Sequence, residues 1–215
     1  MQYSTFAAID IGSYDVILEI FEISKKQGIR SVDKICHRME LGKRYVHAGK
    51  KFARKWKKSC ARVLADFVRI MEGYRVDDYR ATASSAISEA SNSLYVLGKI
   101  HQLTGLSVTV LSNSEQRFLS YKALAAMEDN FNKIIEKGTA ILDLDGGSFQ
   151  ISLFDKDALV TTQNIRMGSL RIRERLAGIQ SETEHYEEMV EELIWNEVSS
   201  FKKDVSERTA KLKTL

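Results

Sequence analysis

Apolar residues along this chain gather into short runs, and two of these runs end at an aspartate followed by a Gly-Ser turn. Residues 140–144 form one run, Asp-Gly-Gly-Ser follows at 145–148, and a second β-rich run covers residues 149–154. The plan is repeated near the N-terminus, where a run at 6–11 leads into Gly-Ser at 12–13. Asp-Gly and Gly-Gly pairs between β-rich runs are typical of hairpins. Each stretch therefore predicts a strand, a turn and a second strand.

The aspartates of this repeated plan, Asp10 and Asp143, are candidates for chemistry. Glycines beside each of them leave backbone N–H groups open to an anion, and a carboxylate can hold a divalent cation. An ordinary hairpin with a surface aspartate would explain one copy. Two copies, about 130 residues apart, indicate two related subdomains, each presenting a turn to a shared cleft.

The remaining pattern predicts a mixed α/β chain. A polar turn at 25–28 separates two further strands, and from about residue 49 the apolar period becomes helical, with Gly73 as a C-cap. The expected first lobe, residues 1–131, contains strands at 6–11, 16–24, 29–36, 79–84 and 106–112. Its expected helices cover about 52–71 and 92–103, and a third follows Ser114 and holds residues 118–127. The expected second lobe, residues 132–215, contains strands at 140–144, 149–154 and 158–165 and a closing helix at about 183–211.

Glu115 stands at the start of the third predicted helix. Ser114 is a plausible N-cap there, and an acid in the first turn suits the helix dipole. That structural role would by itself account for Glu115.

Charge is modest overall but unevenly placed. The formal net charge is +3, yet residues 43–58 carry eight lysines and arginines and no acid. Such a block favours a polyanionic partner. A solvated helix face is the alternative interpretation, and the sequence leaves both open.

The composition argues against several other classes of protein. Cys36 and Cys60 lack the spacing of a metal site, and the four histidines are scattered, so we expect free thiols and no zinc centre. The N-terminus lacks a basic start, and Asp10 interrupts the apolar run, so we expect no signal peptide. No stretch approaches the roughly 20 apolar residues of a membrane helix. We expect a cytoplasmic protein with no membrane or nucleic-acid partner, and allow for a homodimer.

Five motifs, in order and spacing, resemble the exopolyphosphatase/guanosine pentaphosphate phosphatase (Ppx/GppA) family of the actin-like ATPase superfamily. They are Asp-Ile-Gly-Ser at 10–13, Ala-Ser-Ser-Ala-Ile-Ser-Glu-Ala-Ser-Asn at 83–92, Val-Leu-Ser-Asn-Ser-Glu-Gln at 110–116, Leu-Asp-Leu-Asp-Gly-Gly-Ser-Phe-Gln at 142–150 and Met-Gly-Ser-Leu-Arg at 167–171. The resemblance covers nearly the whole chain. It implies two ribonuclease-H-like lobes of mixed sheet plus helices. By the family's standard the second lobe looks truncated at Leu215.

The resemblance also implies a reaction, the hydrolysis of a terminal phosphoanhydride of polyphosphate or guanosine pentaphosphate with Mg²⁺. Phosphoryl transfer of this kind depends on positioning the phosphates, neutralising their charge and orienting a water. Glu115 falls on the glutamate implied as the base for that water, and Asp143 falls on the aspartate implied in holding the metal. The implied phosphate-binding residues are Asp10, Gly12, Ser13, Gly146, Gly147 and Ser148.

Several positions depart from the family pattern. Tyr14 and Asp15 follow the first turn where Asn and Ser are usual, and Ser88 aligns with a phosphate-binding arginine. These changes make the cleft less favourable to a dense anion.

Three more departures lie near the implied base and the second turn. Gln116 replaces the second acid of a Glu-Glu pair, Asp145 replaces the first glycine of a triple-Gly turn, and Gln150 replaces a glutamate. The loss of the carboxylate at position 150 weakens the metal site or the activation of water.

Two functions of different class follow from these residues. The first is an active Mg²⁺-dependent phosphohydrolase, and the second is a catalytically degenerate relative that binds nucleotide or polyphosphate as a regulatory or interaction module. An ATP-using kinase of the same superfamily is a third possibility, although no adenosine-binding glycine motif is visible. Release of phosphate from polyphosphate or guanosine pentaphosphate distinguishes the first two.

Overall fold

A computed structural model describes residues 3–39, 54–88, 90–128, 130–176 and 185–212. The chain divides into two compact units, Met1–Phe118 and Leu119–Leu215. The expected domain limits, 1–131 and 132–215, differ from this division by the second half of one helix and the turn after it. In the described part of the chain, no helix is both long enough and apolar enough to span a membrane.

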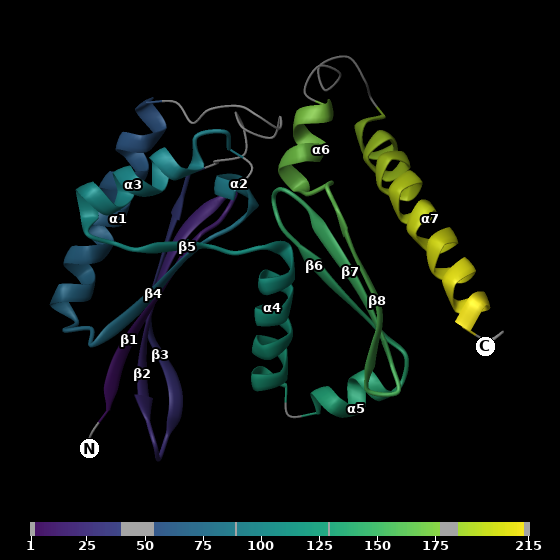
Figure 1. The fold of residues 1–215 in the computed structure, drawn as a ribbon, viewed down its shortest axis with the longest axis horizontal. Helices are drawn as coiled ribbons and strands as arrows, with labels where there is room; N and C mark the ends of the chain where they lie inside the picture. Colours follow the sequence, from purple (N-terminus) through teal and green to yellow (C-terminus); the bar gives the residue numbers. More distant parts are fainter. Residues whose placement is uncertain (1–2, 40–53, 89, 129, 177–184, 213–215) are drawn as a thin grey trace. The chain divides into compact units, whose positions relative to one another are not determined.

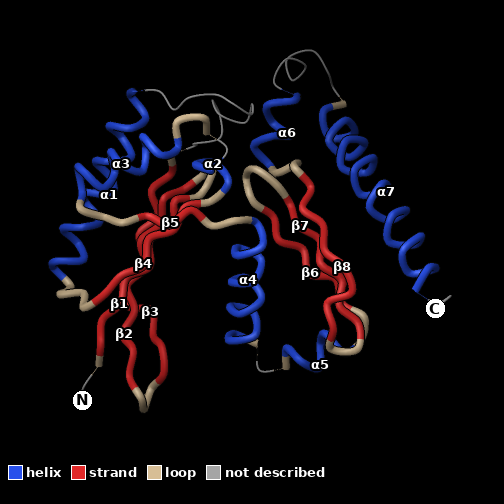
Figure 2. The backbone as a smooth tube through the Cα atoms, viewed as in Figure 1, coloured by secondary structure: helices blue, strands red, loops and turns tan. Residues whose placement is uncertain are grey.

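The first unit contains a five-stranded mixed sheet together with helices (Figures 1 and 2). In chain order its elements are β1 (Ser4–Ile11), β2 (Asp15–Ser24), β3 (Gly28–Arg38), α1 (Arg54–Gly73), β4 (Asp78–Ala83), α2 (Ser85–Ser88), α3 (Ser93–Thr104), β5 (Val108–Val110) and the start of α4 (Asn113–Met127). The strand order is β3-β2-β1-β4-β5. Strands β1 to β3 pair antiparallel, whereas β4 pairs parallel with both β1 and β5. This order and these directions confirm a ribonuclease-H-like unit.

Alternation along β1 and β2 decides which side chains reach the core of this unit. Ile9, Ile11, Val16 and Leu18 are fully buried together with residues of α1 and α3. Burying one such side chain stabilises the fold by roughly 1.5–3 kcal/mol, so this register is strongly fixed. As a result Asp10, one position out of phase, lies on the opposite face of the sheet and is exposed.

The second unit contains a three-stranded antiparallel sheet in the order β6-β7-β8, flanked by helices. After the rest of α4, its elements are α5 (Phe131–Glu136), β6 (Thr139–Leu144), β7 (Phe149–Asp155), β8 (Ala158–Ile165), α6 (Ser169–Leu176) and α7 (Tyr186–Leu212). Strand β8 has the predicted bounds, and α7 differs from its prediction by a few residues.

The central strand β7 is covered on both faces. On one face, Ile151 packs with Ile165 at the end of β8, with Met167 just before α6 and with Phe201 of α7. On the other face, the ring of Tyr121 in α4 meets Phe154 edge-on at 5.2 Å between ring centroids. The Tyr121 hydroxyl also donates a hydrogen bond to Ser152. The second half of α4 is therefore anchored to the face of the sheet that carries Asp143.

Some elements differ from the sequence prediction. Helices α2, α5 and α6 were not predicted, and the strand expected at 106–112 is reduced to Val108–Val110. Gly105 ends α3 in the left-handed region (φ 73°), where a glycine carries no side-chain penalty. Residues 43–53 of the basic block lie outside the described residues.

Candidate phosphate-binding and catalytic site

The first turn, Gly12 to Tyr14, connects β1 to β2. The Gly12 N–H donates to the Asp15 carbonyl at 2.9 Å, which closes the turn. A Cβ at position 12 would lie 3.2 Å from that same carbonyl oxygen. A side chain at position 12 would therefore crowd this carbonyl, so glycine is favoured here because of space and not because of a left-handed backbone. Ser13, the other predicted residue of this turn, is buried.

The segment after β4 lies against this turn. The Ser84 N–H donates to the Ile11 carbonyl at 3.2 Å, so the 83–92 motif meets the 10–13 motif within one unit. The Ser84 hydroxyl is buried and has no hydrogen-bond partner among the described residues. A buried hydroxyl without a partner is costly unless something else satisfies it. Ser84 thus joins Asp10, Gly12 and Ser13 as a candidate anion contact that the sequence did not single out.

The residues that depart from the pattern after this turn have definite positions. The Tyr14 ring lies under the guanidinium of Arg38, with Cζ 4.3 Å from the ring centroid. Asp15 in β2 lies directly opposite Arg38 in β3 in the strand register. The Asp15 carboxylate also lies beside the Cys36 thiol, whose pKa is raised by loss of hydration and, secondly, by that negative charge.

Glu115 lies near the start of α4 and is exposed. Its Oε2 accepts hydrogen bonds from both the N–H and the hydroxyl of Ser112, each at 2.8 Å, while its own N–H points to the Ser112 hydroxyl at 3.3 Å. This reciprocal arrangement is a capping box. The N-cap is therefore Ser112, and the expected cap at Ser114 is wrong, because α4 begins at Asn113.

The capping box also changes the acidity of Glu115. The pKa of its carboxyl is lowered, first by the hydrogen bond from the Ser112 N–H, then by that from the Ser112 hydroxyl, and further by the charge of Arg80. A lowered pKa keeps the carboxylate ionised, which a base requires, but makes it a weaker proton acceptor.

Two other departures in the first unit lie on α2 and α4. Ser88 is exposed at the end of α2. Because serine is uncharged, position 88 presents no cation. Gln116 is half-buried in the first turn of α4, where its N–H donates to the Ser112 carbonyl at 3.0 Å.

The second turn, Asp145 to Ser148, joins β6 to β7. The Asp145 N–H donates to the Ser148 carbonyl at 2.9 Å, and the Gly146 N–H donates to Oδ1 of Asp145 at 2.6 Å. The Asp145 carboxylate therefore already occupies one amide of the predicted anion cradle. Its pKa is raised because it is mostly buried and because Asp143 is nearby, although the bond from Gly146 opposes the shift.

The turn rests directly on the start of α6. The Ser169 and Leu170 N–H groups donate to the Asp145 and Gly146 carbonyls at 3.3 and 2.9 Å. A Cβ on Gly168 would lie 2.3–2.4 Å from the backbone of Asp145 and Gly146. The glycine of the 167–171 motif is thus explained by packing, since a side chain at position 168 would not permit this approach.

Asp143 and Gln150 form a cross-strand pair of β6 and β7, so their side chains share one face of the sheet. Oδ2 of Asp143 accepts a hydrogen bond from the Ser120 hydroxyl of α4 at 2.8 Å. Gln150 is 7% exposed, and its Oε1 has no hydrogen-bond partner among the described residues. Position 150 has lost a carboxylate but still presents an unpaired oxygen beside Asp143.

These oxygens are suited to Mg²⁺ in kind. Mg²⁺ binds hard oxygen ligands and commonly takes only one or two carboxylates, with water and substrate phosphates completing its shell. Within the described ranges, no group of three or more His, Cys, Asp or Glu side chains is close enough to hold a metal. The Asp143 carboxylate and the unpaired Gln150 oxygen are thus of the right chemical kind for Mg²⁺, which would need water and substrate phosphates for most of its ligands.

Each turn is positioned within its own unit, and their meeting across one cleft stays a prediction. Within the first unit the structure brings together Asp10, the Gly12–Ser13 turn and Ser84. Within the second unit it brings together Asp143, Gln150 and the Gly146–Ser148 turn.

Known proteins share this architecture. An Aquifex aeolicus member of the Ppx/GppA family superimposes with a TM-score of 0.69 at 22% identity, over 93% of this chain and 63% of that one. An exopolyphosphatase from Cytophaga hutchinsonii gives a TM-score of 0.68 at 19% identity, over 80% of this chain and 53% of that one. These likenesses show the fold, and this chain spans less than two thirds of both structures.

A curated relative and a family model extend the comparison. The chain is 22% identical over 174 residues to a bifunctional 3-dehydroquinate synthase/phosphatase of Fusobacterium nucleatum, covering 79% of this chain and 26% of that protein. A model of the Ppx/GppA phosphatase family matches residues 19–215. Because that match takes in nearly the whole sequence, the chain belongs to the Ppx/GppA phosphatase family.

Proposed function

We propose that the protein is a phosphohydrolase that releases terminal phosphate from polyphosphate or a guanosine polyphosphate with the help of Mg²⁺. The observation that carries this proposal is the family match over residues 19–215. The arrangement of each turn supports it, because both place oxygen ligands and buried polar groups beside a glycine-containing hairpin.

Binding of the phosphate chain is assigned to the two turns. In the first unit, the Ser84 hydroxyl, buried and unpaired among the described residues, is a donor for a phosphate oxygen next to Gly12 and Ser13. In the second unit, Asp145 occupies the Gly146 N–H. We therefore assign anion contact in this turn to the N–H groups of Gly147 and Ser148.

Asp143 is the residue that would hold Mg²⁺, with the Gln150 Oε1 as a neutral oxygen beside it. When bound, the ion would neutralise charge on the phosphate oxygens. The Ser120 hydroxyl orients the Asp143 carboxylate by its hydrogen bond. An amide at position 150 supplies one negative charge fewer than a carboxylate, so we expect weak metal affinity.

Glu115 would accept the proton of the attacking water. Its Oε2 is bonded twice by Ser112, and its pKa is lowered, so it stays ionised in the cap. The same two bonds orient the carboxylate. The consequence is a base that is available over a wide pH range but weak, which favours slow turnover.

The test is phosphate release from long-chain polyphosphate and guanosine pentaphosphate, measured with and without Mg²⁺. We expect Mg²⁺-dependent release that Glu115→Gln lowers by roughly 10²–10⁴-fold, the usual contribution of a positioned acid–base group. Glu72→Gln, an exposed glutamate on α1, is the matched control and should leave the rate unchanged.

The outcomes separate the two functions. Tight binding of either anion without release would overturn the hydrolase and favour a binding relative. Absence of both binding and release would contradict both. An active enzyme that is indifferent to Glu115→Gln would reduce Glu115 to a capping residue.

A further inference from the structure

We propose that Arg38 is the phosphate-binding cation of the first turn, and that Tyr14 holds it in position. The expected ligand is a phosphate group of an inorganic or nucleoside polyphosphate. This inference rests on the proposed function and adds to it a residue that contributes to substrate affinity.

The first turn needs a positive charge. Asp10 and Asp15 flank it with two carboxylates, and position 88, at the end of α2, is occupied by an uncharged serine. A phosphate chain approaching two carboxylates is repelled unless a cation lies within a few ångströms.

Arg38 is the last residue of β3 and reaches the turn from the side. Its Cα is paired with Asp15, and the N–H of the next residue, Met39, donates to the Tyr14 carbonyl at 3.0 Å. Because directly paired residues share a face and β-strands alternate, Arg38 and Asp15 lie on the same face of the sheet as Asp10. The cation is thus on the face of this sheet that carries Asp10, one of the candidate phosphate-binding residues.

The described contact of the Arg38 guanidinium is with an aromatic ring. Its Cζ lies 4.3 Å from the centroid of the Tyr14 ring. Contact with an aromatic face does not consume N–H donors, and a guanidinium so placed keeps its fork for a bidentate phosphate contact. Over the described ranges, no carboxylate lies within ion-pair distance of Arg38.

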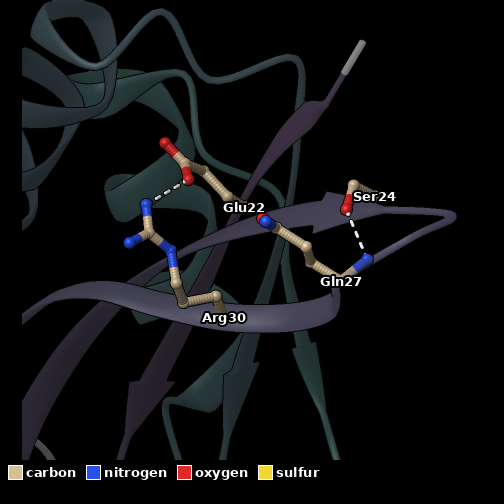
Figure 3. Close-up of polar contacts among 4 residues, drawn as sticks. All are labelled: Glu22, Ser24, Gln27 and Arg30. Carbon is tan, nitrogen blue, oxygen red and sulfur yellow. Dashed lines mark hydrogen bonds and ion pairs between the residues drawn. The ribbon is translucent and has the colours of Figure 1, made fainter. Parts of the chain in front are cut away.

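Arg30 offers a contrast on the same strand. It lies at the other end of β3, where its Nη2 is 2.6 Å from Oε2 of Glu22 (Figure 3). Both arginines are exposed, but one is neutralised by a carboxylate and the other is placed on an aromatic ring beside the turn. This difference makes Arg30 a matched control.

Tyr14 therefore has a different role from the one its bulk suggests. The sequence predicts that Tyr14 makes the site less favourable to a dense anion. In the structure its ring supports Arg38, so the departure at position 14 compensates in part for the missing arginine at position 88.

The experiment is calorimetric titration of the whole chain with sodium tripolyphosphate and Mg²⁺, with circular dichroism to verify folding. Arg38→Gln should weaken binding by about tenfold or more, the usual effect of losing a charge-assisted contact. Arg38→Lys should give an intermediate loss, because the charge remains but the fork does not. Arg30→Gln should bind like the parent protein.

Tyr14 variants test the support separately. Tyr14→Phe keeps the ring and should bind within about twofold of the parent, whereas Tyr14→Leu should lose affinity in the same direction as Arg38→Gln. Equal affinity of parent, Arg38→Gln and Arg30→Gln would overturn this inference and leave the proposed function standing. Failure of the parent itself to bind tripolyphosphate would overturn both. Equal losses in Arg38→Gln and Arg30→Gln would show a diffuse surface charge effect and would also overturn the inference.

Discussion

The Glu115 carboxylate and Ser112 hold each other at the start of α4 through a reciprocal set of hydrogen bonds, two of them 2.8 Å long. The residue implied as the catalytic base is thus also half of a helix cap. Its charge and its position are fixed by the same contacts.

Ser112→Ala removes the hydroxyl but leaves the backbone N–H, so we expect the pKa of Glu115 to rise part of the way towards its ordinary value. A base must be deprotonated, so the acidic limb of the pH–rate profile should move to higher pH. The profile of kcat/KM measures the shift. An unchanged acidic limb in a folded, active variant would exclude Glu115 as the group that titrates.

Asp145→Asn should remove one pH-dependent contribution to the free energy of unfolding. The folded-state pKa of Asp145 is raised, mainly by burial, so its contribution favours folding at low pH and is lost as pH rises from the unfolded pKa, about 3.9, to the folded one. Asparagine keeps an oxygen for the Gly146 N–H but carries no charge. Thermal unfolding on both sides of that interval should show the variant gaining relative to the parent as pH rises, and a constant difference would contradict the assignment.

Gly168→Ala should destabilise the protein by about 1–3 kcal/mol or more, the usual range for overpacking. Its Cβ would lie 2.3–2.4 Å from backbone atoms that cannot move without breaking the second turn. Gly98→Ala is the control, because a Cβ in that interior turn of α3 meets nothing within 4 Å. That control should be neutral or stabilising by up to about 1 kcal/mol, and urea denaturation compares the two variants.

Gln150→Glu, combined with Asp145→Gly and Ser88→Arg, should raise phosphohydrolase activity. The first change returns a carboxylate beside Asp143, the second frees the Gly146 N–H, and the third supplies a forked phosphate donor. The rate with Mg²⁺ should rise, and the Mg²⁺ concentration for half-maximal rate should fall. A folded triple variant that binds polyphosphate but gains no activity would indicate a site remodelled for binding.

The sequence predicted the fold wherever one local pattern decided it. Alternation in β1 and β2 places Ile9 in the core and Asp10 outside it, because a one-residue slip would expose the whole apolar set. The cap of α4 also follows a local pattern, since Ser112 and Glu115 have the Ser-x-x-Glu spacing of a capping box, although the prediction of Ser114 as the cap is wrong.

Features that depend on contacts distant in sequence were not predictable from one chain. Nothing in the local sequence shows that position 168 requires glycine. The requirement comes from the turn at 145–146, some twenty residues earlier, which packs against it. In the sequence, Arg38 is one of many basic residues. Its place over the Tyr14 ring depends on the pairing of β3 with β2. The helix α5, only Phe131–Glu136, is too short to show a period.

The close packing of Gly168 against Asp145 and Gly146 couples the second turn to the start of α6, so that neither can move without the other. A ligand that displaces Asp145 or Gly146 must also disturb the amides of Ser169 and Leu170, which donate to their carbonyls. Hydrogen–deuterium exchange at these two amides would therefore report what happens in the turn, without a label on the turn itself. The first amides of α6 thus report on the conformation of the β6–β7 hairpin.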